Sequence, residues 1–390
     1  MSRRTGIYVQ VPFCQTKCTY CNFHTGVVSK ARFAPYVEAV CAEVENHATL
    51  YAAAGVALPE DFAHSVVDTV YVGGGTPSLL DPEDIQKILD AIRCSFATEL
   101  AEVALEADPE TVTAEKAAAW VRVGINRVSL GVQSFSDKEL AGAGRMHRRS
   151  DVYRAVPILR EAGIRKISFD LIAGLPHQTR SSWQNSLNEL AELGPEHASV
   201  YLLEIDDASR LGGEVLRGGA RYGAASLPSE DEMAAFYEMA CGFLAETGYR
   251  HYEISNWAKP GCESQHNLKY WRREPYLGFG AGAHSFSGTQ RWANAHDPAQ
   301  YVEAIRQGRV PLEQHEIVTP QSALQEELFL GLRELDGIDL GQIERNYGVE
   351  LASRFDPLAS AGLVEREGGM VRLAPGRLSV SNEVFVELMK

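Results

Sequence analysis

The sequence lacks any apolar run long enough to cross a bilayer, which requires about 20 consecutive apolar residues. Its first residues, MSRRTGIYVQVPF, contain two arginines and a short apolar run, but this run ends at Pro12 and has no signal-peptide cleavage site. We therefore expect a cytoplasmic protein whose contact with membranes is at most peripheral.

Positive charge is also scarce. The chain has 390 residues with 37 Lys and Arg against 52 Asp and Glu, a net charge of −15. Because binding to nucleic acid requires clustered Lys and Arg to neutralise phosphates, we expect no nucleic-acid partner.

The chain contains few cysteines, and their number is odd. Of the seven cysteines, three lie near the start and the others, Cys41, Cys94, Cys241 and Cys262, are scattered. This distribution excludes a disulfide framework and favours a reducing compartment.

What the chain does contain is an alternation of apolar strand patterns and helical patterns, which predicts βαβ units and a parallel sheet. Helices are expected at Phe33–Ala54, Pro82–Cys94 and Ser181–Leu193. The six candidate strands are Gly6–Val11, Val67–Val72, Glu102–Glu106, Arg127–Val132, Lys166–Ile172 and Ala198–Ile205. Six such units predict an α/β fold in the form of a partial or complete barrel, with functional residues at the carboxyl ends of the strands.

The pattern changes in the second half of the chain. Arg210–Pro228 is rich in Gly, Ala and Arg and is predicted to be a long loop or lid. Helical patterns at Gln321–Leu335, Leu340–Tyr347 and Leu351–Ser360, with a hairpin around Gly368 and Gly369, predict a small winged-helix-like domain. We therefore divide the chain into a core (1–210), a lid and connecting region (211–310) and a C-terminal domain (311–390).

Cys14, Cys18 and Cys21 directly follow the first strand, in the spacing C-x3-C-x2-C. Three thiolates can bind three irons of a cubane cluster and leave the fourth iron open for a ligand. The alternative is a zinc site closed by a fourth ligand such as His24.

This spacing resembles the signature of the radical S-adenosylmethionine superfamily. The resemblance implies a [4Fe–4S] cluster whose open iron binds the amino and carboxylate groups of S-adenosylmethionine and cleaves it reductively. Tyr20 resembles the aromatic residue that packs beside the adenine, although it could equally be a core aromatic.

Polar residues at the ends of the next strands are candidates for binding S-adenosylmethionine. The Gly-rich turn Gly73–Ser78 permits close approach of a ligand to the backbone, and Thr76 adds a hydroxyl. Glu106 and Asp170 can accept hydrogen bonds from an ammonium or from ribose hydroxyls, and Arg145 can pair with a carboxylate. All should converge at one edge of the sheet.

The segments GGGTPS, LEADPE, GVQSF, GRMH and DLIAGLP, with Tyr8, resemble the branch that contains oxygen-independent coproporphyrinogen III oxidase. The resemblance implies a radical S-adenosylmethionine partial (β/α)6 barrel followed by a winged-helix-like domain. It also implies that the S-adenosylmethionine site is lined by Tyr8, Gly74, Gly75, Thr76, Glu106, Gln133, Arg145 and Asp170.

Two departures argue against oxidase activity. The oxidase has a fourth cysteine two residues after the third, where this chain has Phe23, and a long N-terminal extension, whereas the first cluster cysteine here is already residue 14.

The segment HNLKYW instead resembles the HNxxYW motif of HemW-type heme chaperones. A neutral imidazole is a common axial ligand of heme iron, so His266 is the candidate ligand, with Tyr270 and Trp271 packing on the macrocycle. The alternative is a hydrogen-bonded structural histidine. Cys262 could also reach heme iron, but a free buried thiol is the simpler interpretation. The Gly-rich segment Gly278–His284 is predicted to be a close-packed loop near the active site.

The resemblance therefore implies a protein that binds heme and passes it to acceptor proteins such as respiratory enzymes. The alternatives are an oxidative decarboxylase of coproporphyrinogen III and a radical enzyme that acts on heme itself. No catalytic residue is predicted beyond the cluster ligands, and the sequence leaves open whether the chain is an enzyme and whether it forms a homodimer.

Overall fold

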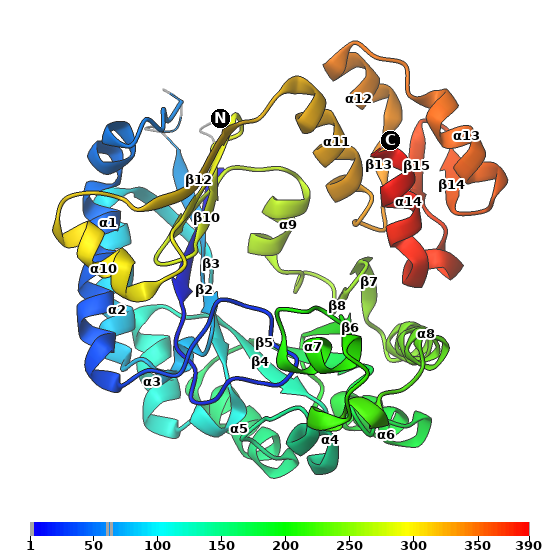
Figure 1. The fold of residues 1–390 in the computed structure, drawn as a ribbon, viewed down its shortest axis with the longest axis horizontal. Coiled ribbons are helices and arrows are strands. Elements are labelled where there is room, and N and C mark those ends of the chain that lie inside the picture. Colours follow the sequence, from blue (N-terminus) through cyan, green and yellow to red (C-terminus); the bar gives the residue numbers. More distant parts are fainter. Residues whose placement is uncertain (1–3, 60–61, 63–64, 390) are drawn as a thin grey trace.

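The computed structural model describes residues 4–59, 62 and 65–389. Its centre is a curved parallel sheet of six strands that alternate with helices (Figure 1). These strands are β1 (Arg4–Val11), β2 (Val66–Gly74), β3 (Ala97–Ala107), β4 (Arg127–Gln133), β5 (Lys166–Ala173) and β6 (His197–Leu202). The predicted α/β architecture is confirmed, with all six strands at the expected places.

The strands are rich in β-branched residues and are buried on both faces, as parallel strands usually are. In β2, for example, Val67, Val70 and Val72 are fully buried. The register pairs Val11 of β1 with Gly74 of β2. The carboxyl ends of these two strands therefore lie side by side, each followed by a loop that carries predicted site residues.

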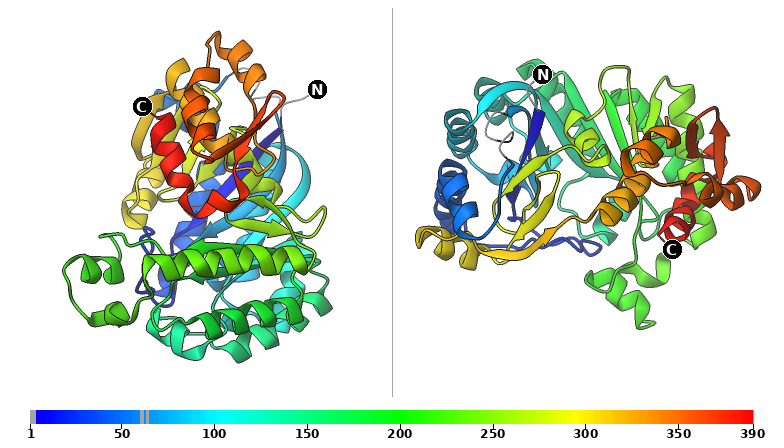
Figure 2. Two further views of the ribbon diagram at one scale, coloured as in Figure 1. Left: turned by 90° about the vertical axis from the view of Figure 1, so that its right-hand side faces the viewer. Right: turned by 90° about the horizontal axis from the view of Figure 1, so that it is seen from above.

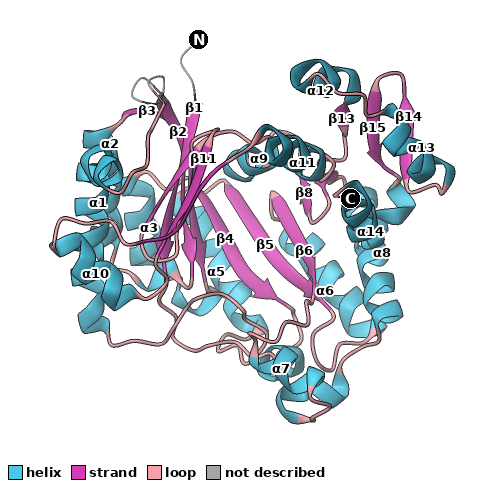
Figure 3. Ribbon diagram, turned by 45° about the horizontal axis from the view of Figure 1, so that its top comes forward, coloured by secondary structure: helices cyan, strands magenta, loops and turns pink. Residues whose placement is uncertain are grey.

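Helices cover the outer face of this sheet. They are α1 (Phe33–Ala53), α2 (Pro82–Ser95), α3 (Ala114–Val123), α4 (Asp137–Gly142), α5 (Arg149–Ala162) and α6 (Arg180–Leu193). Thr113 and Thr179 cap α3 and α6 by accepting hydrogen bonds from backbone N–H groups. Figure 3 shows β4, β5 and β6 running side by side toward the loop region around α7 (Arg210–Leu216).

The sheet extends beyond the six strands at both edges. β9 (Tyr276–Phe279) pairs in parallel with β1 and is followed by antiparallel β10 (His284–Phe286), β11 (Gln290–Asn294) and β12 (Leu312–Ile317). At the other edge, β6 pairs with β8 (Asn256–Ala258), which pairs with β7 (Arg250–Glu253). In the described residues, β12 and β7 are the two outer strands, so the barrel is open.

Part of the segment predicted as a loop at Gly278–His284 belongs to this extension, so that prediction needs correction. Gly278 lies on β9, where a Cβ would collide with the carbonyl oxygen of His284. Gly280 and Gly282 form the turn to β10 with positive φ angles of 101° and 74°.

The prediction of a loop at Arg210–Pro228 is also partly wrong, because this segment contains α7 and a 3-10 helix at Arg221–Ser226. Ser209 caps α7 by accepting a hydrogen bond from the N–H of Gly212. Leu211 packs in a small apolar cluster with Leu175 and Leu203. Tertiary burial thus favours a helix where the local sequence suggests a loop.

Three further helices are α8 (Glu230–Glu246), which precedes β7, α9 (Gln265–Trp271), which lies between β8 and β9, and α10 (Pro298–Arg306), which lies between β11 and β12. The C-terminal domain follows. Its elements are α11 (Pro320–Gly331), β13 (Ile338–Asp339), α12 (Leu340–Tyr347), α13 (Ala352–Ser360), β14 (Val364–Glu367), β15 (Met370–Leu373), a 3-10 helix at Pro375–Val380 and α14 (Ser381–Leu388). A three-stranded sheet in the order β13-β15-β14 with its helices confirms the winged-helix-like prediction.

Figure 2 shows this domain at the β7 end of the sheet, opposite α1 and α10. In the part of the chain that the structure describes, no helix is long and apolar enough to span a membrane.

Candidate functional site

The three predicted cluster cysteines lie on one loop, residues 14–26, which leaves the carboxyl end of β1. The loop is closed by hydrogen bonds from Cys14 N to Gly26 O (3.1 Å) and from Gly26 N to Pro12 O (2.9 Å). It also contacts the Gly-rich turn after β2, where a Cβ on Gly75 would lie 3.0 Å from Cys14 Sγ. A glycine at position 75 therefore lets the turn approach the cysteine loop.

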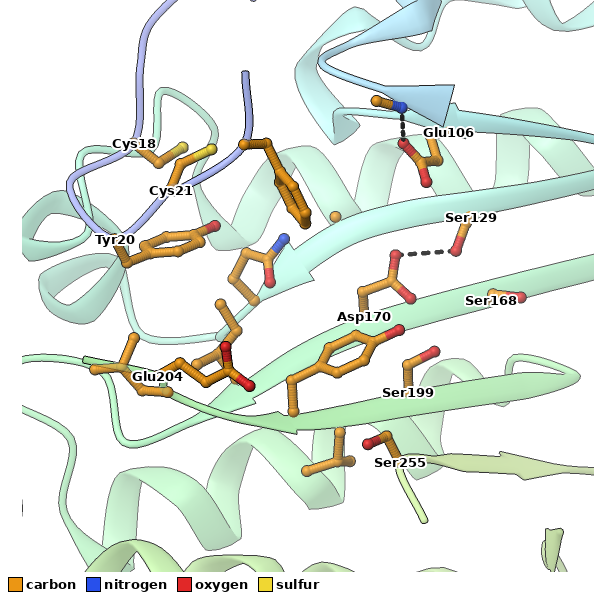
Figure 4. A pocket seen from close by; sticks show the side chains of 18 of the residues that line it. Cys18, Tyr20, Cys21, Glu106, Ser129, Ser168, Asp170, Ser199, Glu204 and Ser255 are labelled. Atoms are coloured by element: carbon orange, nitrogen blue, oxygen red, sulfur yellow. Dashed lines mark hydrogen bonds between the residues drawn. The ribbon is translucent and has the colours of Figure 1, made fainter. Parts of the chain in front are cut away.

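All three cysteines are free, partly exposed and line the same cavity. Figure 4 shows Cys18 and Cys21 together at one end of it, beside Tyr20. Burial raises the pKa of the Cys14 thiol, so this thiol is protonated at neutral pH until a metal displaces the proton.

The arrangement of the cysteines can also be compared with that expected of a zinc site. In the described residues, no three His, Cys, Asp or Glu side chains converge on a single metal ion. A cubane does not need such convergence, because each thiolate binds a different iron. His24 does not line the cavity but stacks on His296, with ring centroids 3.7 Å apart. The residues present therefore fit a three-cysteine cluster better than a zinc site.

The cavity has a volume of about 670 Å³, which lies within the usual range for cofactor sites. It runs from the cysteines across the carboxyl ends of the parallel strands and along the inner face of β4, β5 and β6 (Figure 4). Of the residues predicted to bind S-adenosylmethionine, those that line it are Tyr20, Gly74, Gly75, Thr76, Glu106, Gln133, Arg145 and Asp170.

Tyr8 is the predicted residue that does not line the cavity. Its hydroxyl donates a hydrogen bond to Gln10 Oε1 (2.6 Å), and its ring stacks near Tyr71. In this structure Tyr8 supports the wall behind the site.

Glu106 is held by two donors at the base of the Gly-rich turn. Its Oε2 accepts from Gly74 N (2.8 Å) and its Oε1 accepts from the Tyr71 hydroxyl (3.0 Å). Burial raises the pKa of this carboxyl to about 7 despite both hydrogen bonds. A cationic ligand in the cavity would stabilise its ionised form.

Asp170 is the second buried carboxyl of the cavity. Its Oδ2 accepts a hydrogen bond from Ser129 Oγ (2.9 Å), drawn in Figure 4. Burial raises its pKa as well, although hydrogen bonds from Ser129 and Ser199 act against the shift. Burial thus raises the pKa of two carboxyls in the site, and Arg127 and Arg145 offset part of this effect at Asp170.

Arg145 joins the cavity wall to the cysteine loop. Its guanidinium forms an ion pair with Asp108, donates to Gly131 O (3.0 Å) and lies 3.5 Å from Cys18 Sγ. Asp108 also accepts from Thr76 Oγ1 (3.2 Å). Asp108 was not predicted as a site residue, although it lies in the segment LEADPE directly after Glu106 and Ala107.

Gln133 has a positive φ of 60°, which is rare for a residue with a side chain. Such backbone strain is concentrated at functional sites, because the surrounding structure must impose it. Here it places Gln133 on the cavity wall beside Gly131.

A row of serines on the inner face of the sheet was not predicted. Ser129, Ser168 and Ser199 occupy the third position of β4, β5 and β6, in the triplets Arg-Val-Ser, Lys-Ile-Ser and His-Ala-Ser, and all three line the cavity. This repeated small polar residue within apolar strands was visible in the sequence and could have indicated an inward-facing polar wall.

His266, the predicted heme ligand, is fully buried on α9 and lies outside the cavity. Its Nδ1 is 2.9 Å from Thr69 Oγ1 and its Nε2 is 2.9 Å from the Tyr270 hydroxyl. Burial lowers the pKa of this imidazole to about 3, so it is neutral. Trp271 packs beside Tyr252. With both ring nitrogens engaged, this geometry favours the structural alternative for His266.

Comparison with known proteins agrees with the fold. The Radical SAM superfamily matches residues 8–190, and the HemN C-terminal domain matches residues 318–376. The coproporphyrinogen III oxidase HemN from Escherichia coli has the same fold, with a TM-score of 0.83 at 23% identity, covering 100% of this chain and 90% of that chain. These matches define a radical S-adenosylmethionine protein.

Within that class, the chain belongs to the family of HemW heme chaperones. It is 34% identical to heme chaperone HemW of Bacillus subtilis over 97% of both chains. It is 35% identical to heme chaperone HemW of Escherichia coli over 71% of this chain and 69% of that one.

Proposed function

We propose that the protein binds heme and transfers it to acceptor proteins such as respiratory enzymes, while carrying a [4Fe–4S] cluster and S-adenosylmethionine. The observation that carries the proposal is the similarity to heme chaperones named HemW along nearly the whole chain. The cavity with its three cysteines supports the cofactor part of the proposal.

In this proposal Cys14, Cys18 and Cys21 hold the cluster, which when bound supplies the electron that cleaves S-adenosylmethionine. Glu106 has a buried, largely uncompensated carboxyl, and it would accept from the cationic amino end of the cofactor. Arg145 would share its guanidinium between Asp108 and the cofactor carboxylate.

The remaining contacts with S-adenosylmethionine would come from other residues of the cavity wall. Asp170 would accept from the ribose hydroxyls, and Tyr20 would pack on the adenine from the end of the cavity that holds Cys18 and Cys21 (Figure 4). The serines of β4–β6 would hydrogen-bond the polar groups that reach the inner face of the sheet.

The position that carries a fourth cysteine in the oxidase is occupied here by Phe23, a residue that is 65% exposed. Phe23 offers no thiolate, so heme in this proposal is cargo and coproporphyrinogen III is not a substrate.

Heme transfer can be tested by mixing the heme-loaded, cluster-containing protein with a respiratory heme protein from which heme has been removed. We expect chemically intact heme to appear on the acceptor, at a rate that rises with acceptor concentration because transfer requires contact. A rate independent of acceptor concentration would indicate simple dissociation and contradict a chaperone role.

A parallel assay with coproporphyrinogen III, S-adenosylmethionine and a reductant tests the enzymatic alternative. We expect no protoporphyrinogen above the level of a Cys18→Ala control. Cluster-dependent product formation would identify an oxidase, and an opened or alkylated heme ring would identify a radical enzyme that acts on heme.

A further inference from the structure

Arg145, which in the proposed function receives the cofactor carboxylate, is itself held by a buried histidine. His147 follows Arg145 by two residues and is 1% exposed. Its Nδ1 is 3.4 Å from Arg145 Nε, and its Nε2 is 3.0 Å from the carbonyl oxygen of Val132, near the end of β4. The imidazole therefore bridges a central strand and the guanidinium.

The two partners of His147 fix its tautomer. A carbonyl oxygen only accepts hydrogen bonds, so Nε2 carries the proton and donates to Val132 O. A guanidinium only donates, so Nδ1 is unprotonated and accepts from Arg145 Nε. Burial and the charge of Arg145 lower the pKa of His147 to about 4, which keeps the imidazole neutral, as this arrangement requires.

The other acidic group near Nδ1 does not compete with Arg145. Glu110 Oε2 lies 3.9 Å from Nδ1, which is too far for a hydrogen bond, and within the described residues this oxygen has no hydrogen-bond partner. The imidazole is thus held by the strand on one side and by the guanidinium on the other.

The carbonyl group of Val132 belongs to the tight turn that ends β4. It also accepts a hydrogen bond from Ser134 N (2.7 Å), and the residue between the two is Gln133, with its positive φ of 60°. His147 is therefore anchored to the same turn that places Gln133 on the cavity wall.

The hydrogen bonds of Arg145 show what this anchor does for the guanidinium. Nε donates to His147, while Nη2 pairs with Asp108 and donates to Gly131 O (3.0 Å). In the part of the chain that the structure describes, the hydrogen-bond partner of Nη1 is Cys18 Sγ, at 3.5 Å. Because Nη1 carries two hydrogens, it retains an N–H for a ligand carboxylate on the side of the cysteine loop.

We propose that His147 is a positioning residue for S-adenosylmethionine, because it holds Arg145 through Nε and so presents Nη1 to the carboxylate of the cofactor. The proposal rests on the cofactor site of the proposed function and adds a residue that does not line the cavity. A guanidinium that is fixed before binding loses less conformational entropy when the carboxylate binds. Without this acceptor, Arg145 would keep its ion pair with Asp108 but could turn about it.

Two substitutions separate the two contacts of His147. Asn carries an oxygen near the position of Nδ1, so His147→Asn can still accept from Arg145 Nε but does not reach Val132 O. Gln carries its amide near the position of Nε2, so His147→Gln can still donate to Val132 O but does not accept from Arg145.

The measurement is the affinity of the anaerobic, cluster-loaded protein for S-adenosylmethionine, together with the perturbation of the cluster's electron paramagnetic resonance signal. His147→Gln should weaken binding by roughly tenfold, whereas His147→Asn should stay within about threefold of the wild type. Since His147 acts through Arg145, His147→Gln should cause no further loss of affinity in an Arg145→Ala background.

His47→Gln is the matched control. His47 lies on α1, away from the cavity, its Nδ1 is 2.8 Å from Val44 O, and burial also lowers its pKa. This variant should bind S-adenosylmethionine as the wild type does, even if it is less stable. Thermal unfolding and iron content are measured for every variant, so that loss of affinity is not loss of the fold or of the cluster.

Equal losses of affinity in His147→Asn and His147→Gln would show that His147 only supports the fold, and would overturn the proposal. A full further loss in the Arg145→Ala background would overturn it as well. If only one of the two variants folds, its affinity still decides, because Asn must retain binding and Gln must lose it. If the wild type itself does not bind S-adenosylmethionine, the cofactor part of the proposed function fails, which is a different result from failure of the positioning role.

Discussion

Glu106 links the chemistry of the cavity to the stability of the protein. Burial holds its pKa at about 7 in the folded chain, against an ordinary value of 4.5. Because the folded pKa is the higher one, its contribution to stability is complete below about pH 4.5 and is lost as the pH rises toward 7.

Glu106→Gln should therefore reduce the pH dependence of the free energy of unfolding between about pH 4.5 and 7 in the cofactor-free protein. The same substitution should weaken binding of S-adenosylmethionine by roughly 10–100-fold, because it removes one buried charged contact. Denaturant titrations across this pH range and equilibrium binding measure the two effects.

Glu43 provides the matched control. Burial also raises its pKa to about 7, but it lies away from the cavity and accepts hydrogen bonds from Tyr301 and Asn294. Glu43→Gln should change stability without changing affinity for S-adenosylmethionine. Equal affinity loss in both variants would mean that Glu106 acts only through the fold.

The segment that includes α7 holds the cysteine loop from outside. Leu211 N donates to Thr19 O (2.8 Å), Asn22 Nδ2 donates to Asp206 Oδ2 (2.9 Å), and the Arg210 guanidinium donates to Lys17 O. These contacts cross almost 200 residues of sequence, so local patterns could not reveal them.

Asp206→Ala should loosen this segment and accelerate loss of the cluster to a chelator. Loss of one partly exposed hydrogen bond costs about 1 kcal/mol, which corresponds to a roughly fivefold increase in local opening. Asp231→Ala, an exposed acidic residue in the first turn of α8, should leave the rate unchanged. Equal rates in the two variants would show that the segment does not protect the cluster.

Sequence patterns predicted the repeated βα units well, because buried parallel strands and amphipathic helices both leave strong local signals. They failed where neighbours in space decide the structure. α7 forms because Leu211 is buried against Leu175 and Leu203, and Gly278 lies on a strand because β1 is available to pair with β9. The repeated serine at the third position of β4, β5 and β6, namely Ser129, Ser168 and Ser199, was visible in the sequence but was not predicted as part of the site.

The site was predictable to the extent that its residues follow strand ends. Cys14 follows β1 and Glu106 lies at the end of β3, whereas Asp170 lies within β5, and the structure brings all three to one cavity. His266 could not be assigned from its motif, because its contact with Thr69 joins positions 197 residues apart.

The C-terminal domain also contributes to the cavity. Four of its residues line the cavity, namely Leu378 and Ser379 in the 3-10 helix and Ser381 and Asn382 at the start of α14. The domain is attached through α11, where Glu326 accepts from Arg273 (2.9 Å) and Arg291 (2.6 Å). These ion pairs of α11 therefore help to hold in place a domain that contributes residues to the cavity.

Glu326→Gln should weaken this attachment by about 1–3 kcal/mol, because it removes the charge that two arginines share. Limited proteolysis near residues 317–320 and thermal unfolding should both report the change. Glu365→Gln breaks an exposed pair with Arg372 and should change stability by less than about 0.5 kcal/mol. Equal protease sensitivity in the two variants would contradict docking through Glu326.

The central claim is that the three-cysteine loop and the cavity form one site for a cluster and S-adenosylmethionine. The most direct test is electron paramagnetic resonance of the reduced, reconstituted protein with and without S-adenosylmethionine. We predict close to four irons per chain and a cubane signal that the cofactor perturbs, with the signal absent in Cys14→Ala but retained in Cys94→Ala. A stoichiometric zinc site without iron uptake, or a cubane signal that S-adenosylmethionine leaves unchanged, would contradict the account.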